Sequence, residues 1–391
     1  MDNSRLHYLD WLKVVIVYGI LLFHVSLIFA GGGWLVNNSS RSLLLGAFAA
    51  FTFPWGIPAM FLIAGADAWF ALRSHSTLSF VRARFLRLLV PLVPGLLILS
   101  PWQYFVISQP PPYHLNAILP FYLHFLQSFQ PASPFGWINQ HWLHLWFLAY
   151  LFAVSMACLP ALLFLHRPAA SRLSALALSL ASHPFGLVLL AAPLVVAQVV
   201  LRPLFPSYQG WADVATYVFV FSAGALLICD RRFSIWLRRY GRFHFIFALS
   251  VSLCLGLFAL LAPSNSPENP AVPLLARLTY AFLYPLYVWS WLLVVLYAGL
   301  RWLNFSHPIQ VYARESVLPF YVLHHPVVIT VAAFVVTLNL SLWAKFFLIV
   351  FISFPTILAI YEFGIRRWTL TRLLFGLKAK ESKEQAIPAS A

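Results

Sequence analysis

Charged residues are scarce in this sequence of 391 residues: Asp, Glu, Lys and Arg together make up 9% of it. A water-soluble domain normally carries about a quarter charged residues, so a soluble globular protein is excluded. Cysteine is also rare, since Cys158, Cys229 and Cys254 lie in apolar stretches and form no Cys-x-x-Cys pair. This pattern predicts neither a disulfide framework nor a zinc site.

Apolar residues, in contrast, make up 62% of the chain, which has a mean hydropathy of +0.84. They gather in runs of about 20 residues, the length a helix needs to cross a hydrocarbon core about 30 Å thick. We therefore predict an all-α polytopic membrane bundle of about ten transmembrane helices, one domain at 1–378, followed by a short disordered cytoplasmic tail at 379–391. The predicted spans are 11–31, 43–72, 85–107, 142–165, 185–201, 211–229, 243–262, 278–300, 316–336 and 343–363.

The excess of basic over acidic residues, 25 against 10, indicates the orientation of these spans. Cytoplasmic loops of membrane proteins are enriched in Lys and Arg. With ten spans and both termini in the cytoplasm, the basic residues fall on the inner side except for Arg41, Arg202, Arg277 and Lys345. The net charge of +15 is therefore assigned to orientation in the membrane, and no nucleic-acid partner is predicted.

The first apolar run is longer than the core of a secretory signal, and its segment carries Asp10, Lys13 and His24, so we expect an uncleaved span. Ionisable groups within spans are costly and are candidates for function. The spacing of Lys13 and His24 places them within roughly 20° of one helical face and about 16 Å apart along the axis. The alternative is that Lys13 extends to the inner surface and His24 binds a neighbouring helix.

Polar residues also mark the inner ends of the second and third spans. Asp67 requires a partner, which Lys13 or an inner arginine could supply, and the small residues at 64–66 permit close helix approach. Arg84 and Arg87 are one helical turn apart, an arrangement suited to a phosphate-bearing ligand because guanidinium binds phosphate oxygens in a fork. The alternative is a basic anchor at the cytoplasmic surface.

Two further spans carry histidine pairs. His141 and His144 open the fourth span at a metal-pair spacing, but no acidic or Cys ligand accompanies them, so no metal is predicted. In the ninth span Glu315 lies at the inner end, and the adjacent His324 and His325 lie at mid-membrane depth. Packing alone does not explain an adjacent histidine pair inside a membrane helix.

Taken in order, these segments resemble acyltransferase family 3, the polytopic membrane enzymes that O-acylate carbohydrates, and within it the glucan biosynthesis protein C-like branch. The resemblance covers most of the chain. Its motifs are Leu9-Asp10-Trp11-Leu12-Lys13 with Phe23-His24, Met60 to Gly65, Arg84-x-x-Arg87 with Pro91, Pro101-Trp102-Gln103-Tyr104, His144-Leu145-Trp146-Phe147-Leu148, and Glu315 through Pro319-Phe320-Tyr321 to His324-His325-Pro326. One departure is Lys13, because the family usually has Arg there and lysine lacks the bidentate fork.

The resemblance implies transfer of an acyl group, acetyl or succinyl, from cytoplasmic acyl-CoA to a hydroxyl of a carbohydrate or other exported acceptor at a bacterial inner membrane. It implies that His24 is the general base and that Arg84 and Arg87, with Lys13, hold the donor. The other candidates are His324 and Glu315 for catalysis, and His144, Trp146, Tyr321 and His325 for substrate contacts. The expected partners are the acyl-CoA co-substrate, a glycan or small hydroxylated acceptor and the lipid bilayer, without a permanently bound cofactor.

Three other functions compete with acyl transfer. A proton-coupled transporter or flippase would use His24, Asp67 and His324 as a proton relay, but the internal repeats typical of transporters are not visible. A bis-histidine haem or metal protein would use His24, His144 and His324. A pH sensor or scaffold would use the same histidines and bind no acyl-CoA.

Overall fold

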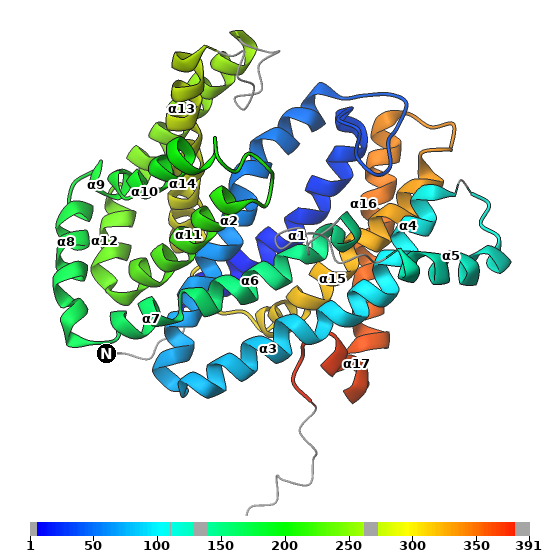
Figure 1. The fold of residues 1–391 in the computed structure, drawn as a ribbon, viewed down its shortest axis with the longest axis horizontal. Coiled ribbons are helices and arrows are strands. Elements are labelled where there is room, and N and C mark those ends of the chain that lie inside the picture. Colours follow the sequence, from blue (N-terminus) through cyan, green and yellow to red (C-terminus); the bar gives the residue numbers. More distant parts are fainter. Residues whose placement is uncertain (1–5, 110, 129–139, 262–272, 380–391) are drawn as a thin grey trace, which may run out of the picture. The chain divides into compact units, whose positions relative to one another are not determined.

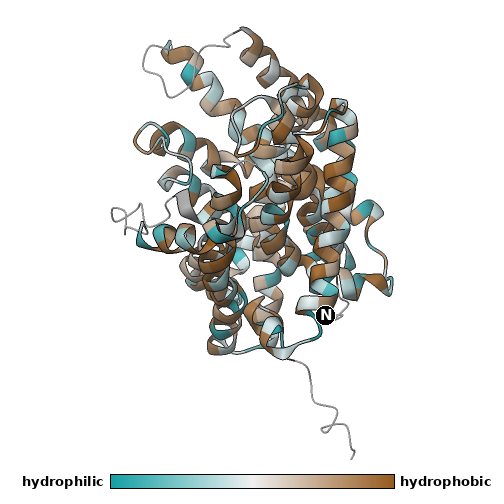
Figure 2. Ribbon diagram, turned by 90° about the vertical axis from the view of Figure 1, so that its right-hand side faces the viewer, coloured by the Kyte–Doolittle hydropathy of each residue, from teal (hydrophilic) through white to brown (hydrophobic). Residues whose placement is uncertain are grey.

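The computed structural model describes residues 6–109, 111–128, 140–261 and 273–379, which form helices joined by loops (Figure 1). Among these residues, eight helices are long and apolar enough to cross a membrane, and a ninth candidate is the pair Trp142–Ala157 and Leu159–Leu165, bent by 48°. Apolar residues dominate these helices in Figure 2. The protein is therefore a multi-pass membrane protein with an all-α fold. The predicted tail at 379–391 lies outside the described residues except for residue 379.

Nine of the ten predicted spans coincide with these membrane-capable segments, and the run at 185–201 differs. It is broken into α9 (Gly186–Leu189), α10 (Ala192–Val196) and the π-helical turn η4 (Ala197–Leu201), and it is shorter than the other spans. Sixteen residues of helix cover only about 24 Å. The count of ten and the cytoplasmic position of both termini thus stay predictions.

The chain divides into two compact units, each described separately below, and several helices contribute residues to both. The first unit contains Met1–Ile16, Ala50–Phe80 and Ala153–Gln310. Its helices are the start of α1 (His7–Ala30), most of α2 (Leu43–Ser74), the start of α3 (Thr77–Pro94), the end of α6 (Trp146–Ala157), α7 (Leu159–Leu165), η3 (Pro168–Ala170), α8 (Ser171–Ala181), α9, α10, η4, α11 (Trp211–Cys229), α12 (Arg231–Arg239), α13 (Gly241–Leu261), α14 (Leu274–Trp302) and the start of α15 (Ile309–Val335).

Close helix contacts hold the first unit together. α13 and α14 run side by side (Figure 1). α2 and α11 approach so closely that a Cβ atom on Gly65 would lie 1.8 Å from the carbonyl oxygen of Phe221, and one on Gly224 would lie 1.9 Å from that of Leu62. The close approach predicted at residues 64–66 is therefore confirmed at Gly65.

The second unit contains Val17–Ala49, Val81–Phe152 and Val311–Ala391. Its helices are the remainder of α1, the start of α2, most of α3, η1 (Gly95–Leu99), α4 (Ser100–Ser108), α5 (Leu115–Gln127), η2 (Gln140–Leu145), most of α6, most of α15, α16 (Leu342–Ala359), η5 (Ile360–Ile365) and α17 (Thr369–Leu374). Arg82, Arg84 and Arg87 lie on helix α3, which begins at Thr77, before the predicted span 85–107.

Aromatic and polar contacts order the segments of the second unit that are predicted to lie on the outer side. The segment between the predicted spans 85–107 and 142–165 contains α5, whose Tyr122 hydroxyl donates a hydrogen bond to the Ile98 carbonyl oxygen at 2.9 Å. Phe105 and Ile329 form a buried core on which this part of the chain packs. Lys345, one of the four cations predicted on the outer side, is buried and donates to Asn38 Oδ1 at 3.2 Å, so it is part of the packing.

Candidate active site

Four histidines from three parts of the sequence converge in the second unit. His24 comes from α1, His144 from the 3-10 turn η2, and His324 and His325 from α15. The His24 ring centroid lies 5.0 Å from that of His324 and 4.8 Å from that of His325. His144 is 5.0 Å from His324 and stacks on His325 at 4.6 Å. We call these four residues the histidine cluster.

Exposure distinguishes His24 from the rest of the histidine cluster. His144, His324 and His325 are buried, with 7%, 0% and 3% of their surface exposed. His24 is only partly buried. A reactant that reaches this cluster would therefore meet His24 first.

Hydrogen bonds to backbone carbonyls determine which ring nitrogen of three histidines carries the proton. His24 Nδ1 lies 3.0 Å from the Ile20 carbonyl oxygen, and His144 Nε2 lies 3.1 Å from that of Val322. His324 Nδ1 lies within hydrogen-bond distance of the Tyr321 carbonyl oxygen. A carbonyl oxygen only accepts, so each of these nitrogens must be the donor, and the other nitrogen of the neutral ring is an acceptor.

The fourth histidine is oriented by a side chain. His325 Nδ1 lies 2.5 Å from Gln103 Oε1, and the Gln103 amide nitrogen donates to the Leu99 carbonyl oxygen at 3.0 Å. Because the amide nitrogen is occupied by Leu99, the amide oxygen faces the histidine and accepts its proton. Gln103 is fully buried on α4, so a single amide sets the tautomer of His325.

When its histidines are neutral, the histidine cluster therefore has acceptor nitrogens that no protein group in the described ranges occupies. His144 Nδ1 and His324 Nε2 are buried and have no hydrogen-bond partner among the described residues. His24 Nε2 likewise has no hydrogen bond within the part of the chain that the structure describes. A ligand that donates hydrogen bonds, such as an alcohol, matches these acceptor nitrogens. A ligand with acceptor groups alone does not.

A kink in the backbone aims His144 into the cluster. Leu143 has φ 46° and ψ −127°, which interrupts the helix before α6. The Tyr321 hydroxyl donates to the His144 carbonyl oxygen beside this kink. The expectation of a regular helix from residue 142 is thus wrong at its first turn. Tyr321 orients His144, and its hydroxyl proton is already occupied by that carbonyl.

The metal alternatives drawn from the sequence depended on histidine spacing. Within the described ranges, no group of three or more His, Cys, Asp or Glu side chains is arranged to hold a metal ion. The side chain of His141 lies outside the description.

Two residues of this site were not assigned a role from the sequence. Trp34 lies in the loop after α1, with its ring centroid 5.7 Å from that of His24 and 5.5 Å from that of His325. Gln103 was part of a quoted motif but carried no role. A lone amide within an apolar span is costly to bury, and that signal could have identified Gln103. Trp34, in a glycine-rich loop, gave no such signal.

Two other predicted site residues, Trp146 and Glu315, contact groups outside the histidine cluster. The Trp146 ring contacts those of Phe147 and Tyr150 on its own helix. The Glu315 carboxylate forms an ion pair with Arg372 at 2.7 Å, which links α15 to the C-terminal helix α17. Glu315 precedes His324 by about 14 Å along α15.

The predicted donor residues belong to both units. In the first unit Lys13 contacts two carboxylates, Asp10 at 3.0 Å and Asp67 at 2.8 Å, so the partner expected for Asp67 is Lys13. In the second unit Arg84 is half-buried on α3 and Arg87 is exposed.

The C-terminal segment packs directly beneath this part of α3. Gly376 has a φ of +69°, and a Cβ atom there would lie 2.5 Å from the Arg87 carbonyl oxygen. Only glycine permits both this backbone conformation and this contact. The chain after α17 thus supports the turn of α3 that carries Arg87.

The histidine cluster offers acceptor nitrogens suited to proton transfer, and the α3 turn that carries Arg84 and Arg87 offers two cations. A family model described as an acyltransferase domain matches residues 6–362, nearly the whole chain. No curated protein and no solved structure matches the sequence. The match is to the family as a whole, so the glucan biosynthesis C-like branch stays a prediction. The chain belongs to acyltransferase family 3 and is a multi-pass membrane acyltransferase.

Proposed function

We propose that the protein transfers an acyl group, acetyl or succinyl, from acyl-CoA to a hydroxyl of a carbohydrate or other exported acceptor, with His24 as the general base. One observation carries this proposal. The Ile20 carbonyl oxygen holds the proton on Nδ1 of His24, which leaves Nε2 as an acceptor at the least buried position of the histidine cluster. A base must be unprotonated at the nitrogen that faces the attacking hydroxyl.

The reaction balances without a further co-reactant. The acceptor oxygen attacks the thioester carbonyl carbon while His24 Nε2 takes the hydroxyl proton. The carbon–sulfur bond then breaks, and the CoA thiolate recovers that proton from the imidazolium. The products are an ester of the acceptor and free CoA.

The transient oxyanion needs a hydrogen-bond donor. The N–H groups of His144 and His324 are bound to backbone carbonyls, and the Tyr321 hydroxyl is bound to another. The Trp34 indole N–H has no partner among the described residues and lies beside His24. Trp34 is therefore the donor we favour over the histidines and Tyr321.

Arg84 and Arg87 are proposed to bind the phosphates of the donor. Lys13 already forms ion pairs with Asp10 and Asp67, so we expect it to contribute less than the two arginines to phosphate binding. From Arg87, the helical segments α3, η1 and α4 lead to Gln103, about 24 Å along the axis. The donor thus spans this depth when its phosphates contact the arginines and its thioester reaches the histidine cluster.

The base is tested with His24→Ala and His24→Gln in membranes that contain the full chain, radiolabelled acetyl-CoA and an envelope glycan extract. We expect transfer to fall at least about a hundredfold, since a positioned base contributes that much or more. His183→Ala, at an exposed histidine of the first unit, is the matched control. Full activity of a folded His24→Ala protein would refute the role of His24.

The donor site is tested by thermal stability of the purified protein with CoA, acetyl-CoA and succinyl-CoA. A ligand that binds only the folded state raises the apparent stability. We expect the Arg84→Ala/Arg87→Ala protein to lose this effect and an exposed control, Arg73→Ala, to keep it. Equal stabilisation of the double variant and the wild type would exclude these arginines as donor ligands.

A further inference from the structure

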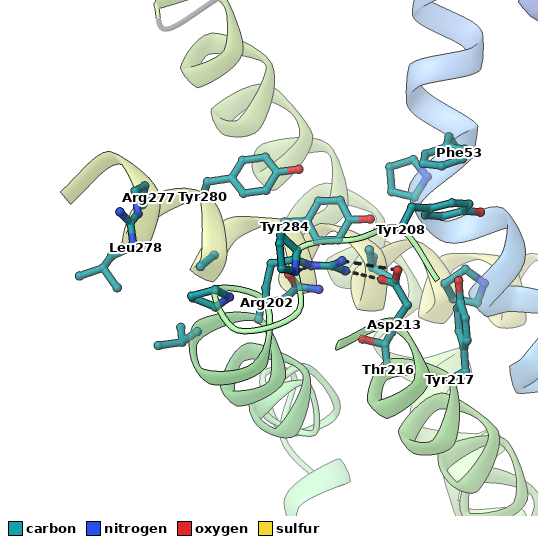
Figure 3. Close-up of a pocket in the computed structure, with 18 of the residues that line it drawn as sticks. Phe53, Arg202, Tyr208, Asp213, Thr216, Tyr217, Arg277, Leu278, Tyr280 and Tyr284 are labelled. Carbon is teal, nitrogen blue, oxygen red and sulfur yellow. Dashed lines mark hydrogen bonds and ion pairs between the residues drawn. The ribbon is translucent and has the colours of Figure 1, made fainter. Parts of the chain in front are cut away.

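The first unit contains a pocket that no step of acyl transfer uses. Its volume is about 570 Å³, within the range of small-molecule sites. Residues of α2, of the segment from η4 to the start of α11, and of the first half of α14 line it (Figure 3). Every lining residue belongs to this one unit.

An ion pair on the pocket wall is satisfied by the protein itself. The Arg202 guanidinium forms two contacts with the Asp213 carboxylate and donates from Nε to Gln198 Oε1 at 3.3 Å. The backbone N–H of Gln209 donates to Asp213 Oδ2 at 2.7 Å. The charges of Arg202 and Asp213 neutralise each other, so this ion pair is part of the pocket wall and needs no charged ligand.

The second cation of the pocket wall is Arg277, in the first turn of α14. It is half-buried, and its guanidinium forms no ion pair or hydrogen bond within the described ranges. The hydroxyl of Tyr284, two helical turns further along α14, likewise has no hydrogen bond among the described residues. Arg277 and Phe53 lie at opposite ends of the pocket in Figure 3.

The predicted topology excludes the ordinary explanation for these cations. Basic residues at the inner surface serve as anchors, but Arg202 and Arg277 are two of the four that fall on the outer side. The charge of Arg202 is neutralised by Asp213, whereas no carboxylate in the described part of the chain neutralises the charge of Arg277. An external anion would give Arg277 a partner.

Five aromatic rings also line the pocket, those of Phe53, Tyr208, Tyr217, Tyr280 and Tyr284. Tyr280 and Tyr284 stack at a centroid distance of 5.4 Å, and Tyr208 contacts Phe53 at 5.6 Å. In Figure 3, Tyr280 and Tyr284 extend from α14 toward the side where Tyr208 and Phe53 lie. Aromatic faces bind the C–H faces of sugar rings, while phenol and amide groups at their edges bind sugar hydroxyls.

We propose that this pocket binds an anionic saccharide, one or two sugar rings that bear a carboxylate or phosphate, either free or as the headgroup of a lipid. The sugar rings lie against Tyr208, Tyr280 and Tyr284, and the anion binds the Arg277 guanidinium in a fork. Leu274 and Leu278 are exposed beside Arg277 and would contact the acyl chains of a lipid-linked ligand. This binding needs neither His24 nor an acyl donor, so it is tested independently of acyl transfer.

The test is direct binding to the full chain, purified in a detergent without a sugar headgroup. Glucuronate and a sugar phosphate are compared with glucose, with inorganic phosphate and with sodium chloride at equal ionic strength. We expect both anionic sugars to bind saturably and glucose more weakly. Arg277→Gln should reduce binding of the anionic sugars at least about tenfold and leave glucose unchanged. Tyr284→Phe should weaken all three sugars several-fold.

Arg301→Gln is the matched control, because Arg301 lies exposed in the last turn of the same helix. A second experiment compares glucuronosyl diacylglycerol, a lipid whose headgroup is an anionic sugar, with phosphatidylglycerol in mixed micelles. Tighter binding of the glucuronosyl lipid, lost in Arg277→Gln, supports a lipid-linked saccharide. Equal binding of phosphate and the anionic sugars, binding of phosphatidylglycerol without any sugar, or an equal loss in Arg301→Gln would each overturn the proposal.

Discussion

At the scale of single residues, the site depends on groups that hold histidines in a defined tautomer. Three histidines of the cluster use backbone carbonyls, which substitution cannot remove, but His325 uses the side chain of Gln103. Gln103 is buried, and both ends of its amide are occupied. This makes Gln103 the most direct test of whether orientation of the cluster matters for transfer.

Gln103→Leu keeps the side-chain size but leaves the His325 N–H without an acceptor. We expect kcat to fall at least about tenfold, and the unfolding free energy to fall by about 1–3 kcal/mol for the unpaired buried donor. Stabilisation by acyl-CoA should stay at the wild-type level, because the donor ligands are elsewhere. A purely structural role would instead lower kcat and acyl-CoA binding together, as measured by transfer rates and thermal shift.

Asp230 is a second residue whose contribution can be isolated. It caps α12, and its Oδ1 accepts from the Arg232 backbone N–H at 2.8 Å. The side-chain hydrogen bond from Arg232 also lowers the pKa of the Asp230 carboxyl. A carboxyl whose pKa is lower in the folded state stabilises the fold fully when the pH is above its ordinary pKa of about 3.9. This stabilisation is lost as the pH falls through the lowered pKa.

Asp230→Ala should therefore lower the unfolding free energy by about 1 kcal/mol at neutral pH, the usual cost of a lost cap. Asp230→Asn should keep the hydrogen bond of the cap and lose only the stabilisation that comes from the ionised carboxylate, which is the contribution that depends on pH. Unfolding in detergent at neutral pH and at about pH 2, below the ordinary pKa of the carboxyl, would separate the two contributions. A neutral-pH stability of Asp230→Ala equal to wild type would show that α12 does not need this cap.

At the scale of helices, the crossing of α2 and α11 has no room for another atom. The Cβ positions of Gly65 and Gly224 both fall on backbone carbonyl oxygens of the facing helix, which cannot rotate away. Gly65→Ala and Gly224→Ala should each lower stability by about 1–3 kcal/mol, the usual cost of overpacking. Thermal unfolding of the two single variants measures the effect.

Gly56→Ala is the matched control on α2, because no heavy atom lies within 4 Å of its added Cβ. Alanine favours helix over glycine by up to about 1 kcal/mol, so this variant should be neutral or slightly stabilised. If Gly56→Ala lost as much stability as Gly65→Ala, the cause would lie in α2 itself and not in its contact with α11.

The sequence predicted the existence of most helices but not their breaks. Long apolar runs specify a membrane helix by composition, so 211–229 matches α11 (Trp211–Cys229) at both ends. The same composition continues through the kink at Leu143 and through the broken segment 186–201. A kink depends on tertiary partners such as the Tyr321 hydroxyl, and a hydropathy pattern contains no information on those partners.

The histidine cluster was predicted in its members but not in its geometry. His24, His144, His324 and His325 were identified because polar groups are costly in spans. Their convergence brings together positions about 300 residues apart, and no periodicity within one helix encodes such a contact. Trp34 was missed for the complementary reason, since a tryptophan near a membrane surface is ordinary.

At the scale of the whole molecule, the orientation depends on the broken segment Gly186–Leu201. If it crosses the membrane, the basic loops after residue 229 face the cytoplasm, as the positive-inside pattern requires. If it does not cross, every later helix reverses and those basic residues lie outside. The distribution of Lys and Arg therefore predicts that this segment crosses, although it is shorter than the other spans.

Labelling of single cysteines tests this orientation in a protein whose three native cysteines are replaced. Ser171 and Ser207 are exposed on either side of the broken segment, and Ser40 and Ser76 are exposed references for the outer and inner surfaces. We expect Ser171→Cys to react with an impermeant reagent only after lysis, like Ser76→Cys. Ser207→Cys should react on intact cells, like Ser40→Cys. Identical behaviour of residues 171 and 207 would show that the segment returns to the surface it left, and would place Arg202 and the mouth of the saccharide pocket on the cytoplasmic side.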